Sequence, residues 1–306
     1  MYIWTNVLGS FVFDDKLKII DSVLFKNVDD LKKKEQIEKQ LNKKYNKGQL
    51  NNEQIKRILA HFKHNSNFAK FREYNLHLTK LAIKNSVKND HLIIQTINAI
   101  TEIDKAANML AKRLREWYEL YLPEFSKSLQ DHEKFVELVL KKSKKELIQE
   151  NKIKETMGAD IDISSALFLA KEVQSLFELR KKEEEYLEKI MKETCPNTQA
   201  IAGSTIGAKL LEKAGSLKRL AEFPASTVQL LGAEKALFRH MKTGARPPRF
   251  GFLHEHPLIS KMKEKEKGKV ARALADKISL AAKVDLFGGE KDFGIKVRKQ
   301  LEEKFK

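Results

Sequence analysis

The chain has 306 residues, enough for two or three domains, and 42% of them are hydrophobic, which is sufficient for buried cores. It carries 59 lysine and arginine residues against 42 aspartate and glutamate residues, a formal net charge of +17, which favours a polyanionic partner. The excess is concentrated in residues 201–306, which have 23 basic and 12 acidic side chains, a net +11. A charged surface of the thermophilic kind is the alternative interpretation of such a composition.

Cysteine content and hydropathy exclude several further classes. Cys195 is the single cysteine, so an internal disulfide and a Cys-rich zinc site are excluded. The first twenty residues lack the pattern of a secretory signal, and no apolar run approaches the ~18 residues of a membrane helix. We therefore expect a protein of a reducing compartment, the cytoplasm or the nucleus.

Residues 1–90 have the mixed pattern of a small α/β domain. β-branched and aromatic residues dominate 2–13 and again 17–25, with a polar turn between them, which predicts two strands of a hairpin. Sparse apolar positions among lysines predict an exposed helix over 28–45. A second helix over 51–63 should bury one side, formed by Ile55, Ile58, Leu59 and Phe62.

Residues 91–193 predict a long helical arm. Apolar residues recur at steps of three and four along 93–121 and again along 163–177, and Pro123 and Pro196 end the two runs. Two runs of similar length favour an antiparallel pair, with short helices from 124–160 at its tip. Because isolated helices draw most of their stability from packing, we expect two copies to associate through this arm. The residues predicted to mediate this dimerisation are Ile100, Ile103, Ala107, Leu110, Leu114 and Trp117. The alternative is that both helices pack along the flanking domains.

Residues 194–306 have helical patterning throughout, at 198–214, 216–222, 226–242 and 269–284, which predicts an all-α bundle. The fold class is therefore α+β and mainly α. It comprises an α/β domain at 1–90, a two-helix coiled coil at 91–193 and an all-α domain at 194–306.

Residues 232–257, GAEKALFRHMKTGARPPRFGFLHEHP, form the most distinctive stretch. A helix opening at Gly232 places Lys235, Arg239 and Lys242 near one face, and Ala236, Leu237 and Met241 can face inward. Gly244 suits a helix C-cap. In the following ARPPRF segment, the two prolines hold two arginine side chains on a stiff piece of backbone. The result is a basic edge of defined shape.

Three blocks, GAEKALFRHMKTGARPPRFG, HEHPLI and GKVARALADKISLAAKVD, closely resemble the signature of the Nop domain. This domain is the RNA-and-protein-binding module of box C/D ribonucleoprotein core proteins. The likeness extends upstream through AGSLKRLAEFPASTVQLLGAEK and Pro196-Asn197 to the REWY block that ends at Tyr118. The opening LGSFVFDD and DSVLFKN are similar to the start of archaeal members of the family.

The resemblance implies a scaffold with three roles. The domain at 1–90 would dock the methyltransferase fibrillarin, the coiled coil would form a homodimer, and the Nop domain would bind guide RNA together with a small kink-turn-binding protein related to ribosomal proteins. S-adenosylmethionine would be bound by fibrillarin, so this chain would need no cofactor. The residues expected to contact RNA are Gln229, Lys235, Arg239, Lys242, Arg246, Arg249 and His254. The protein would be cytoplasmic in an archaeon and nucleolar in a eukaryote.

Two other functions fit the sequence less well. An enzyme acting directly on RNA is disfavoured, because the sequence has no dinucleotide-type glycine loop, no carboxylate cluster with metal spacing and no nucleophile in a catalytic setting. A Nop protein of the spliceosomal type, binding RNA without a methyltransferase, is the alternative within the family. The similarity at the N-terminus favours the box C/D scaffold for guided 2′-O-methylation of rRNA or tRNA.

Overall fold

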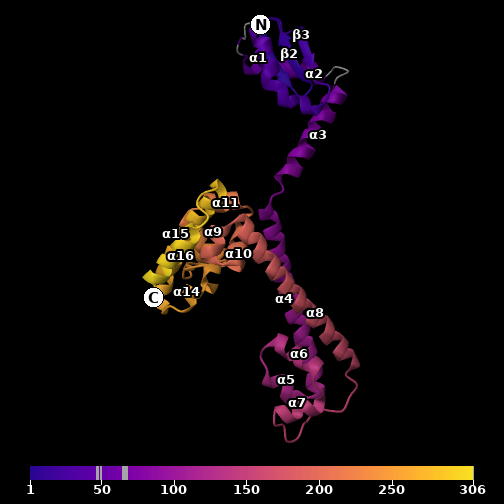
Figure 1. Ribbon diagram of the computed structural model, residues 1–306, viewed down its shortest axis with the longest axis vertical. Helices are drawn as coiled ribbons and strands as arrows, with labels where there is room; N and C mark the ends of the chain where they lie inside the picture. Colours follow the sequence, from indigo (N-terminus) through magenta and orange to yellow (C-terminus); the bar gives the residue numbers. More distant parts are fainter. Residues whose placement is uncertain (46–47, 49, 64–67, 306) are drawn as a thin grey trace. The chain divides into compact units, whose positions relative to one another are not determined.

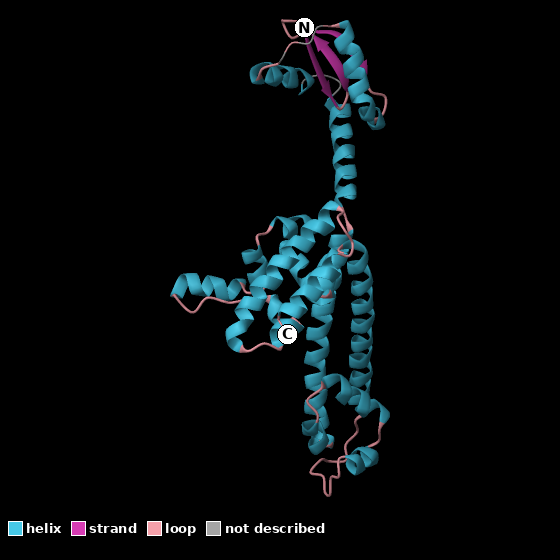
Figure 2. Ribbon diagram, turned by 60° about the vertical axis from the view of Figure 1, so that its left-hand side comes forward, coloured by secondary structure: helices cyan, strands magenta, loops and turns pink. Residues whose placement is uncertain are grey.

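The computed structural model describes residues 1–45, 48, 50–63 and 68–305, and the chain divides into two compact units, Met1–Lys88 and Asn89–Lys306 (Figure 1). The fold is α+β and mainly α, as predicted, with a three-stranded sheet in the first unit and helices throughout the second (Figure 2). None of the described helices combines the length and apolar character that crossing a membrane requires.

The sheet of the first unit has three antiparallel strands in the order β1-β2-β3, formed by Tyr2–Asn6, Gly9–Phe13 and Ile19–Leu24. The prediction of a single strand over 2–13 was therefore wrong. The side chain of Asn6 accepts hydrogen bonds from the amides of Leu8 and Gly9, at 2.8 and 3.3 Å, and so reverses the chain in the middle of that stretch. Gly9 also passes the third strand too closely for a side chain, because a Cβ there would lie 2.2 Å from the carbonyl oxygen of Val23.

Strand β2 is buried along its whole length because helices cover both faces of the sheet. The first unit also contains a 3₁₀ turn at Val28–Lys33 and the helices α1 (Lys34–Lys44), α2 (Asn52–Lys63) and α3 (Phe68–Ser86). Phe11 and Phe13 pack with Ile58 of α2 on one face, and Val12 packs with Leu41 of α1 on the other. This division follows from the alternation of side chains along a strand. Leu59, which the helical pattern predicted on the buried side of α2, is 44% exposed.

The predicted arm is present as two long helices, α4 (Asn89–Tyr121) and α8 (Ser164–Thr194), which lie side by side (Figure 1). At 1.5 Å per residue each spans about 50 Å. Three short helices between them close the tip of the pair, as expected: α5 (Pro123–Ser128), α6 (His132–Lys141) and α7 (Lys144–Glu150).

The tip is organised around the REWY block. Tyr118 is 1% exposed, and its ring lies edge-on to the rings of Phe125 and Phe135, at 5.8 and 5.6 Å between centroids. Arg115 lies over the ring of Phe135 at 4.3 Å and donates hydrogen bonds to the carbonyl oxygens of Ser126 and Asp131. These contacts attach α5 and α6 to α4.

Most of the apolar seam along α4 is buried inside one chain. Ile100, Ala107 and Leu114 are 4%, 0% and 0% exposed, and Leu110 is partly buried against the same core as Ala107 and Leu114. Three of the residues predicted to contact a second copy therefore have almost no surface with which to do so. Ile103 is partly buried, and Trp117 is 39% exposed. Pairing of two copies stays a prediction, and of the predicted residues Ile103, Leu110 and Trp117 keep exposed surface for it.

The rest of the second unit is a helical bundle, as predicted. Its elements are α9 (Pro196–Ala202), α10 (Ser204–Ala214), α11 (Leu217–Glu222), α12 (Ala225–Leu230), α13 (Glu234–Thr243), a 3₁₀ turn at Phe252–Glu255, α14 (Pro257–Ser260), α15 (Glu264–Phe287) and α16 (Phe293–Lys304). The helices predicted over 198–214 and 226–242 are each broken in two. Gly203 and Gly232 adopt φ values of +81° and +90°, which right-handed helix does not allow.

The central helix of the bundle is α15, whose small residues allow close contact with its neighbours. The hydrophobic core of the bundle, which surrounds α15, also contains Ile93 and Ile97 of α4 and Leu187 and Met191 of α8. The root of the arm and the bundle thus share one hydrophobic core, which explains why they form a single compact unit. The domain boundary predicted at residue 193 does not coincide with a boundary between the two compact units.

Candidate nucleic-acid interface

Residues 232–250 form a projection, here called the finger, that leaves the bundle after α12 and returns to it before the 3₁₀ turn. Its two ends are joined by backbone hydrogen bonds from Gly251 to Gln229 and from Phe252 to Leu231, both 2.8 Å. The side chain of Gln229 adds a third bond, donated to the carbonyl oxygen of Arg249 at 2.6 Å. Gly251 is required here, because a Cβ would lie 1.8 Å from the carbonyl oxygen of Leu231. The closed base allows the finger to extend from the bundle in a defined direction.

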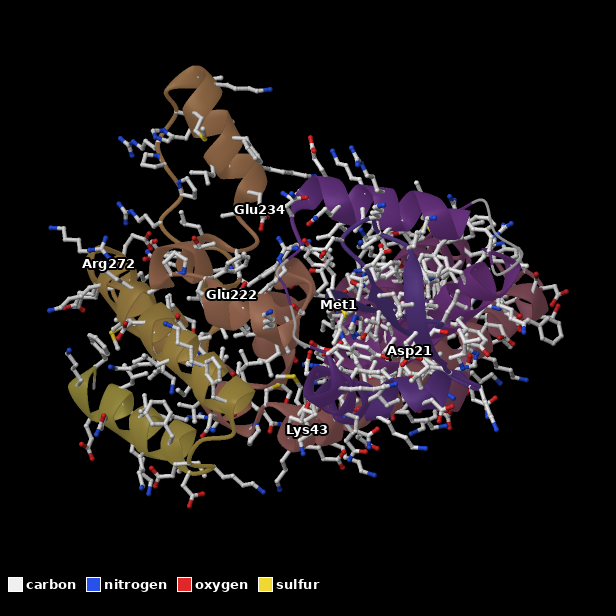
Figure 3. The ribbon with its side chains drawn as sticks, turned by 90° about the horizontal axis from the view of Figure 1, so that it is seen from above. Met1, Asp21, Lys43, Glu222, Glu234 and Arg272 are labelled. Atoms are coloured by element: carbon white, nitrogen blue, oxygen red, sulfur yellow. The ribbon has the colours of Figure 1, made fainter. Side chains whose placement is uncertain are left out.

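Helix α13 is the body of the finger, and it contains no buried residue. Figure 3 shows the helix that begins at Glu234 extending away from the rest of its unit. Lys235, Arg239 and Lys242 are exposed and follow one another at steps of four and three, so they share one face, as predicted. Of the three residues predicted to face inward, Ala236 and Leu237 are partly buried, whereas Met241 is 71% exposed.

The far end of the finger is shaped by a cap. Gly244 adopts φ +68° and its amide bonds the carbonyl oxygen of His240 at 2.9 Å, which is the αL helix ending predicted for it. The ring of His240 donates from Nδ1 to the carbonyl oxygen of Ala245 and holds the chain as it turns back. The side chain of Arg246 then projects into solvent. The guanidinium group of Arg249 lies 3.6 Å from the carboxylate of the exposed Glu264, a weak pairing in water.

Two hollows lie at the base of the finger. The first has a volume of about 580 Å³ and is lined by Lys235 and Arg239 of α13, by Lys213 from the end of α10, and by Phe252. The carboxylate of Glu234, also in its wall, accepts a hydrogen bond from the amide of Gly232 at 2.7 Å and fixes the start of the helix. Three cationic side chains thus converge on one concave surface.

The second hollow, about 520 Å³, lies between α12, the returning end of the finger and α15. The predicted residues Gln229 and Arg249 line it, together with Lys269 and Arg272 of α15. Lys242 and Arg246 line neither hollow. The structure therefore groups four of the predicted RNA-contacting residues around two hollows and leaves these two on the exposed part of the finger.

The two histidines of the HEH stretch have different environments. His254 is exposed, and its Nδ1 donates to the carbonyl oxygen of Gly251 at 3.0 Å. His256 is 3% exposed: Nε2 donates to the carbonyl oxygen of Ile201 at 3.0 Å, and Nδ1 accepts from the amide of Leu258 at 3.2 Å. Burial lowers the pKa of His256. This residue therefore packs within the core of the bundle and joins the start of α14 to the end of α9.

Other reactive arrangements are limited within the described residues. No group of three or more His, Cys, Asp and Glu side chains there could hold a metal ion. Cys195 is fully buried at the junction of α8 and α9, and burial raises the pKa of its thiol. A buried thiol in its protonated form is a poor nucleophile.

The sequence patterns missed three cations of the hollows. Lys213, Lys269 and Arg272 lie 19 or more positions from the finger residues that they approach, and each sits in a helix whose pattern predicts only an ordinary charged surface. Their charge was visible in the net +11 of residues 201–306, but their convergence was not.

A family profile described as Nop, "snoRNA binding domain, fibrillarin", matches residues 99–306. The chain belongs to the Nop family. The match includes the finger, both hollows and most of the arm. It shows that the resemblance drawn from the finger sequence was correct.

Several Nop relatives are similar over most of this chain. It is 39% identical over 251 residues to an uncharacterized NOP5 family protein of Methanocaldococcus jannaschii, covering 75% of this chain and 61% of that protein. It is 36% identical over 279 residues to nucleolar protein 56 of Dictyostelium discoideum, covering 79% of this chain and 52% of that protein. It is 35% identical over 253 residues to nucleolar protein 56 of Saccharomyces cerevisiae, covering 74% and 50% respectively. The chain thus spans between half and three fifths of the length of these relatives.

A solved structure titled as a fibrillarin/Nop5p complex was also matched. The similarity has a TM-score of 0.47 and 24% sequence identity, and it covers 98% of this chain and 99% of the solved one.

Proposed function

We propose that this Nop protein is a non-catalytic scaffold of a box C/D ribonucleoprotein that guides 2′-O-methylation, holding guide RNA and a kink-turn-binding protein at one unit and fibrillarin at the other. The observation that carries the proposal is the finger, whose cations and apolar side chains are exposed together within the region of the family match. The protein would contribute position and orientation rather than a reacting group. The chemistry, with its S-adenosylmethionine, would belong to fibrillarin.

The finger has the features of a composite surface for RNA and protein. Lys235, Arg239 and Lys242 supply charge for phosphate groups, which gives affinity that falls as salt rises. Beside them on the same helix, Phe238 and Met241 are 59% and 71% exposed. Large apolar side chains this exposed are typical of a site that a protein partner covers. The phosphate groups that the neighbouring cations attract would leave them in water, so we assign them to the kink-turn-binding protein.

The experiment is a salt-titrated gel shift on a box C/D RNA, with and without the kink-turn protein, and with a mutated kink-turn as the control. Tight binding should require both the partner and the intact kink-turn. Lys235→Gln combined with Arg239→Gln should weaken this binding at least about tenfold and reduce the dependence of log K on log salt by about 0.9 for each phosphate that is no longer neutralised. Lys283→Gln with Lys299→Gln, which removes two exposed charges from α15 and α16 outside both hollows, is the matched control. Equal binding to any RNA would contradict the proposal.

For fibrillarin, the first unit offers strand β3, which lies at one edge of the sheet in the described part of the chain. Strand β3 pairs with β2 on one side, and its apolar residues Ile19, Ile20, Val23 and Leu24 are 38–58% exposed. An exposed apolar edge strand is avoided in proteins unless something covers it. We therefore assign this strand to the methyltransferase. Leu24→Lys should weaken co-purification with fibrillarin and leave RNA binding unchanged; equal co-purification would remove the assignment.

For the homodimer, the outer face of α8 offers an alternative to the buried seam. Phe168, Leu179 and Tyr186 are 66%, 42% and 44% exposed and lie 11 and 7 residues apart, which places them in one stripe along the helix. Met109 and Leu120, on α4, are 67% and 59% exposed. We propose that a second copy packs against these side chains. Two copies would double the number of RNA and enzyme sites in one particle and raise their effective concentration.

A further inference from the structure

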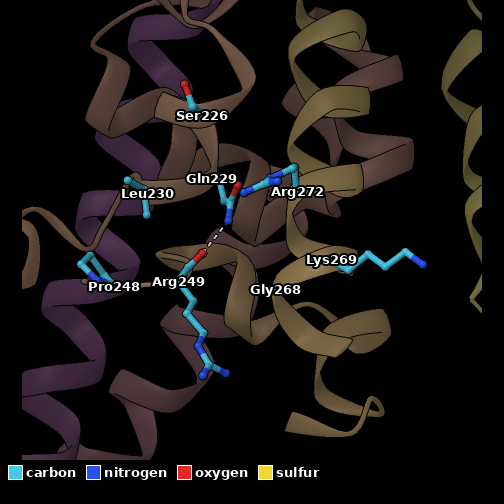
Figure 4. A pocket seen from close by; sticks show the side chains of 8 residues that line it. All are labelled: Ser226, Gln229, Leu230, Pro248, Arg249, Gly268, Lys269 and Arg272. Atoms are coloured by element: carbon cyan, nitrogen blue, oxygen red, sulfur yellow. Dashed lines mark hydrogen bonds between the residues drawn. The ribbon is translucent and has the colours of Figure 1, made fainter. Parts of the chain in front are cut away.

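The hollow between α12, α15 and the end of the finger contains more than a basic patch. Figure 4 shows the guanidinium group of Arg272 directed toward the side chain of Gln229, with Leu230 and Pro248 forming the opposite wall. The side chains of Arg249 and Lys269 extend away from this centre in the same view. The hollow therefore has a planar cation and an amide at its centre, an apolar wall, and two further cations at its rim.

The charges of this hollow are unbalanced. Its lining contains three cations and no acidic residue, and of these cations Arg249 faces the carboxylate of Glu264 at 3.6 Å. In the described part of the chain, neither Lys269 nor Arg272 has a hydrogen bond or an ion pair through its side chain. The Nε2 group of Gln229 is used by the carbonyl oxygen of Arg249, whereas no donor among the described residues reaches its Oε1 atom. The site thus offers unused cationic donors and one unused, well-positioned acceptor.

These features match the chemistry of an unpaired nucleotide. The volume of about 520 Å³ lies within the range of about 300–1,000 Å³ found for small-molecule sites. Proteins that recognise RNA commonly take an unstacked base onto an aromatic ring or an arginine plane and bond its edge with an amide. A phosphate group alone needs neither the apolar wall of Leu230 and Pro248 nor the acceptor of Gln229.

We propose that this hollow binds one unpaired nucleotide of the guide RNA. The base lies on the guanidinium plane of Arg272 against Leu230 and Pro248, with its edge on Gln229, and the flanking phosphates lie on Arg249 and Lys269. The inference rests on the proposed function for the presence of RNA. It adds a contact on α15, outside the finger, and a requirement for an extruded base.

The test uses the full chain with the kink-turn protein and a set of guide RNAs, each with one abasic nucleotide at a different unpaired position. One abasic position should weaken binding of the wild-type chain by about tenfold, as expected for a stacked base. Arg272→Gln should weaken binding of the unmodified RNA by a similar factor and add no further loss at that position. Lys269→Gln should reduce the salt dependence by about 0.7, the value for one single-strand phosphate contact. Lys283→Gln, an exposed lysine of α15 that lines neither hollow, is the matched control.

Three outcomes would overturn the inference. The first outcome is that the Arg272→Gln chain binds every RNA as tightly as the Lys283→Gln chain does, which would mean that the hollow is not occupied. The second outcome is that the loss of affinity from Arg272→Gln multiplies with the loss from every abasic position, which would mean that Arg272 contacts a phosphate and no base. The third outcome is that no abasic position weakens the wild-type complex. All three leave kink-turn-dependent binding through the finger intact, so a failure of this inference is distinct from a failure of the proposed function.

Discussion

The carboxylate of Asp285 should be one of the most important single groups for the stability of the second unit. It accepts hydrogen bonds from the amide and the side-chain nitrogen of Asn197, at 3.1 and 2.9 Å, and from the amide and hydroxyl group of Thr198, at 2.8 and 2.7 Å. Asn197 also accepts a bond from the amide of Gly294 at 2.7 Å. One carboxylate near the end of α15 thus joins it to the start of α9 and, through Asn197, to α16.

The magnitude follows from what Asp285→Ala would leave behind. Asn197 and Thr198 are 2% and 0% exposed, so water has little access to the amides that would lose their partner. Each unsatisfied buried donor costs about 1–3 kcal/mol. We therefore expect Asp285→Ala to lower the free energy of unfolding by about 3–5 kcal/mol. Asp285→Asn, which keeps one acceptor, should cost about half as much.

Urea unfolding followed by circular dichroism would measure the loss. With a slope of about 2–3 kcal/mol per molar, the midpoint for Asp285→Ala should fall by about 1–2 M. Asp276→Ala, on the same helix but exposed, should change the free energy by less than about 0.5 kcal/mol. Hydrogen exchange should locate the loss in α9. Equal midpoints for Asp285→Ala and Asp276→Ala would refute the reasoning.

Three further predictions concern the base of the finger, pH and the arm. Gly251→Ala should destabilise the second unit by about 1–3 kcal/mol or more and weaken RNA binding in a gel shift, because the base of the finger must open to admit the methyl group. Stability should fall as pH drops below about 6.5, the unfolded pKa of histidine, because the folded pKa of His256 is lowered and protonation at Nδ1 would break its bond from Leu258. His256→Gln should flatten that profile in urea unfolding at pH 5–8; an unchanged profile would contradict the assignment. Phe168→Lys with Leu179→Lys should halve the mass seen in sedimentation without lowering the melting temperature, and an unchanged mass would exclude this face as the dimer contact.

Local patterns in the sequence were sufficient for much of the fold. The steps of three and four along the arm predicted α4 and α8, because an amphipathic helix needs little beyond periodicity to be recognised. Gly244 predicted the end of α13, since only a residue that tolerates positive φ ends a helix in that way. The finger sequence also identified the family. Some predictions failed for a local reason: Asn6 turned one expected strand into two, and Gly203 and Gly232 each broke an expected helix.

The partner of an apolar face was not determined by sequence. The seam containing Ala107 and Leu114 has the same spacing whether it packs against a helix of its own chain or against a second copy. Only the tertiary structure showed that α8 and the tip helices cover it. It also showed that Phe168 and Leu179 are exposed to solvent, and the helical pattern alone gave no reason to select them as contacts for a second copy.

In the candidate site, too, some features follow from the sequence and others only from the tertiary structure. By itself, the sequence determined the family, the helical character and the basic face of the finger, because these depend on residues close together in the chain. Only the tertiary structure placed Arg272 beside Gln229, 43 positions earlier, and opened a hollow between them. Chain neighbours share a helix face through fixed backbone geometry, whereas residues on different helices meet only through the packing of the whole core.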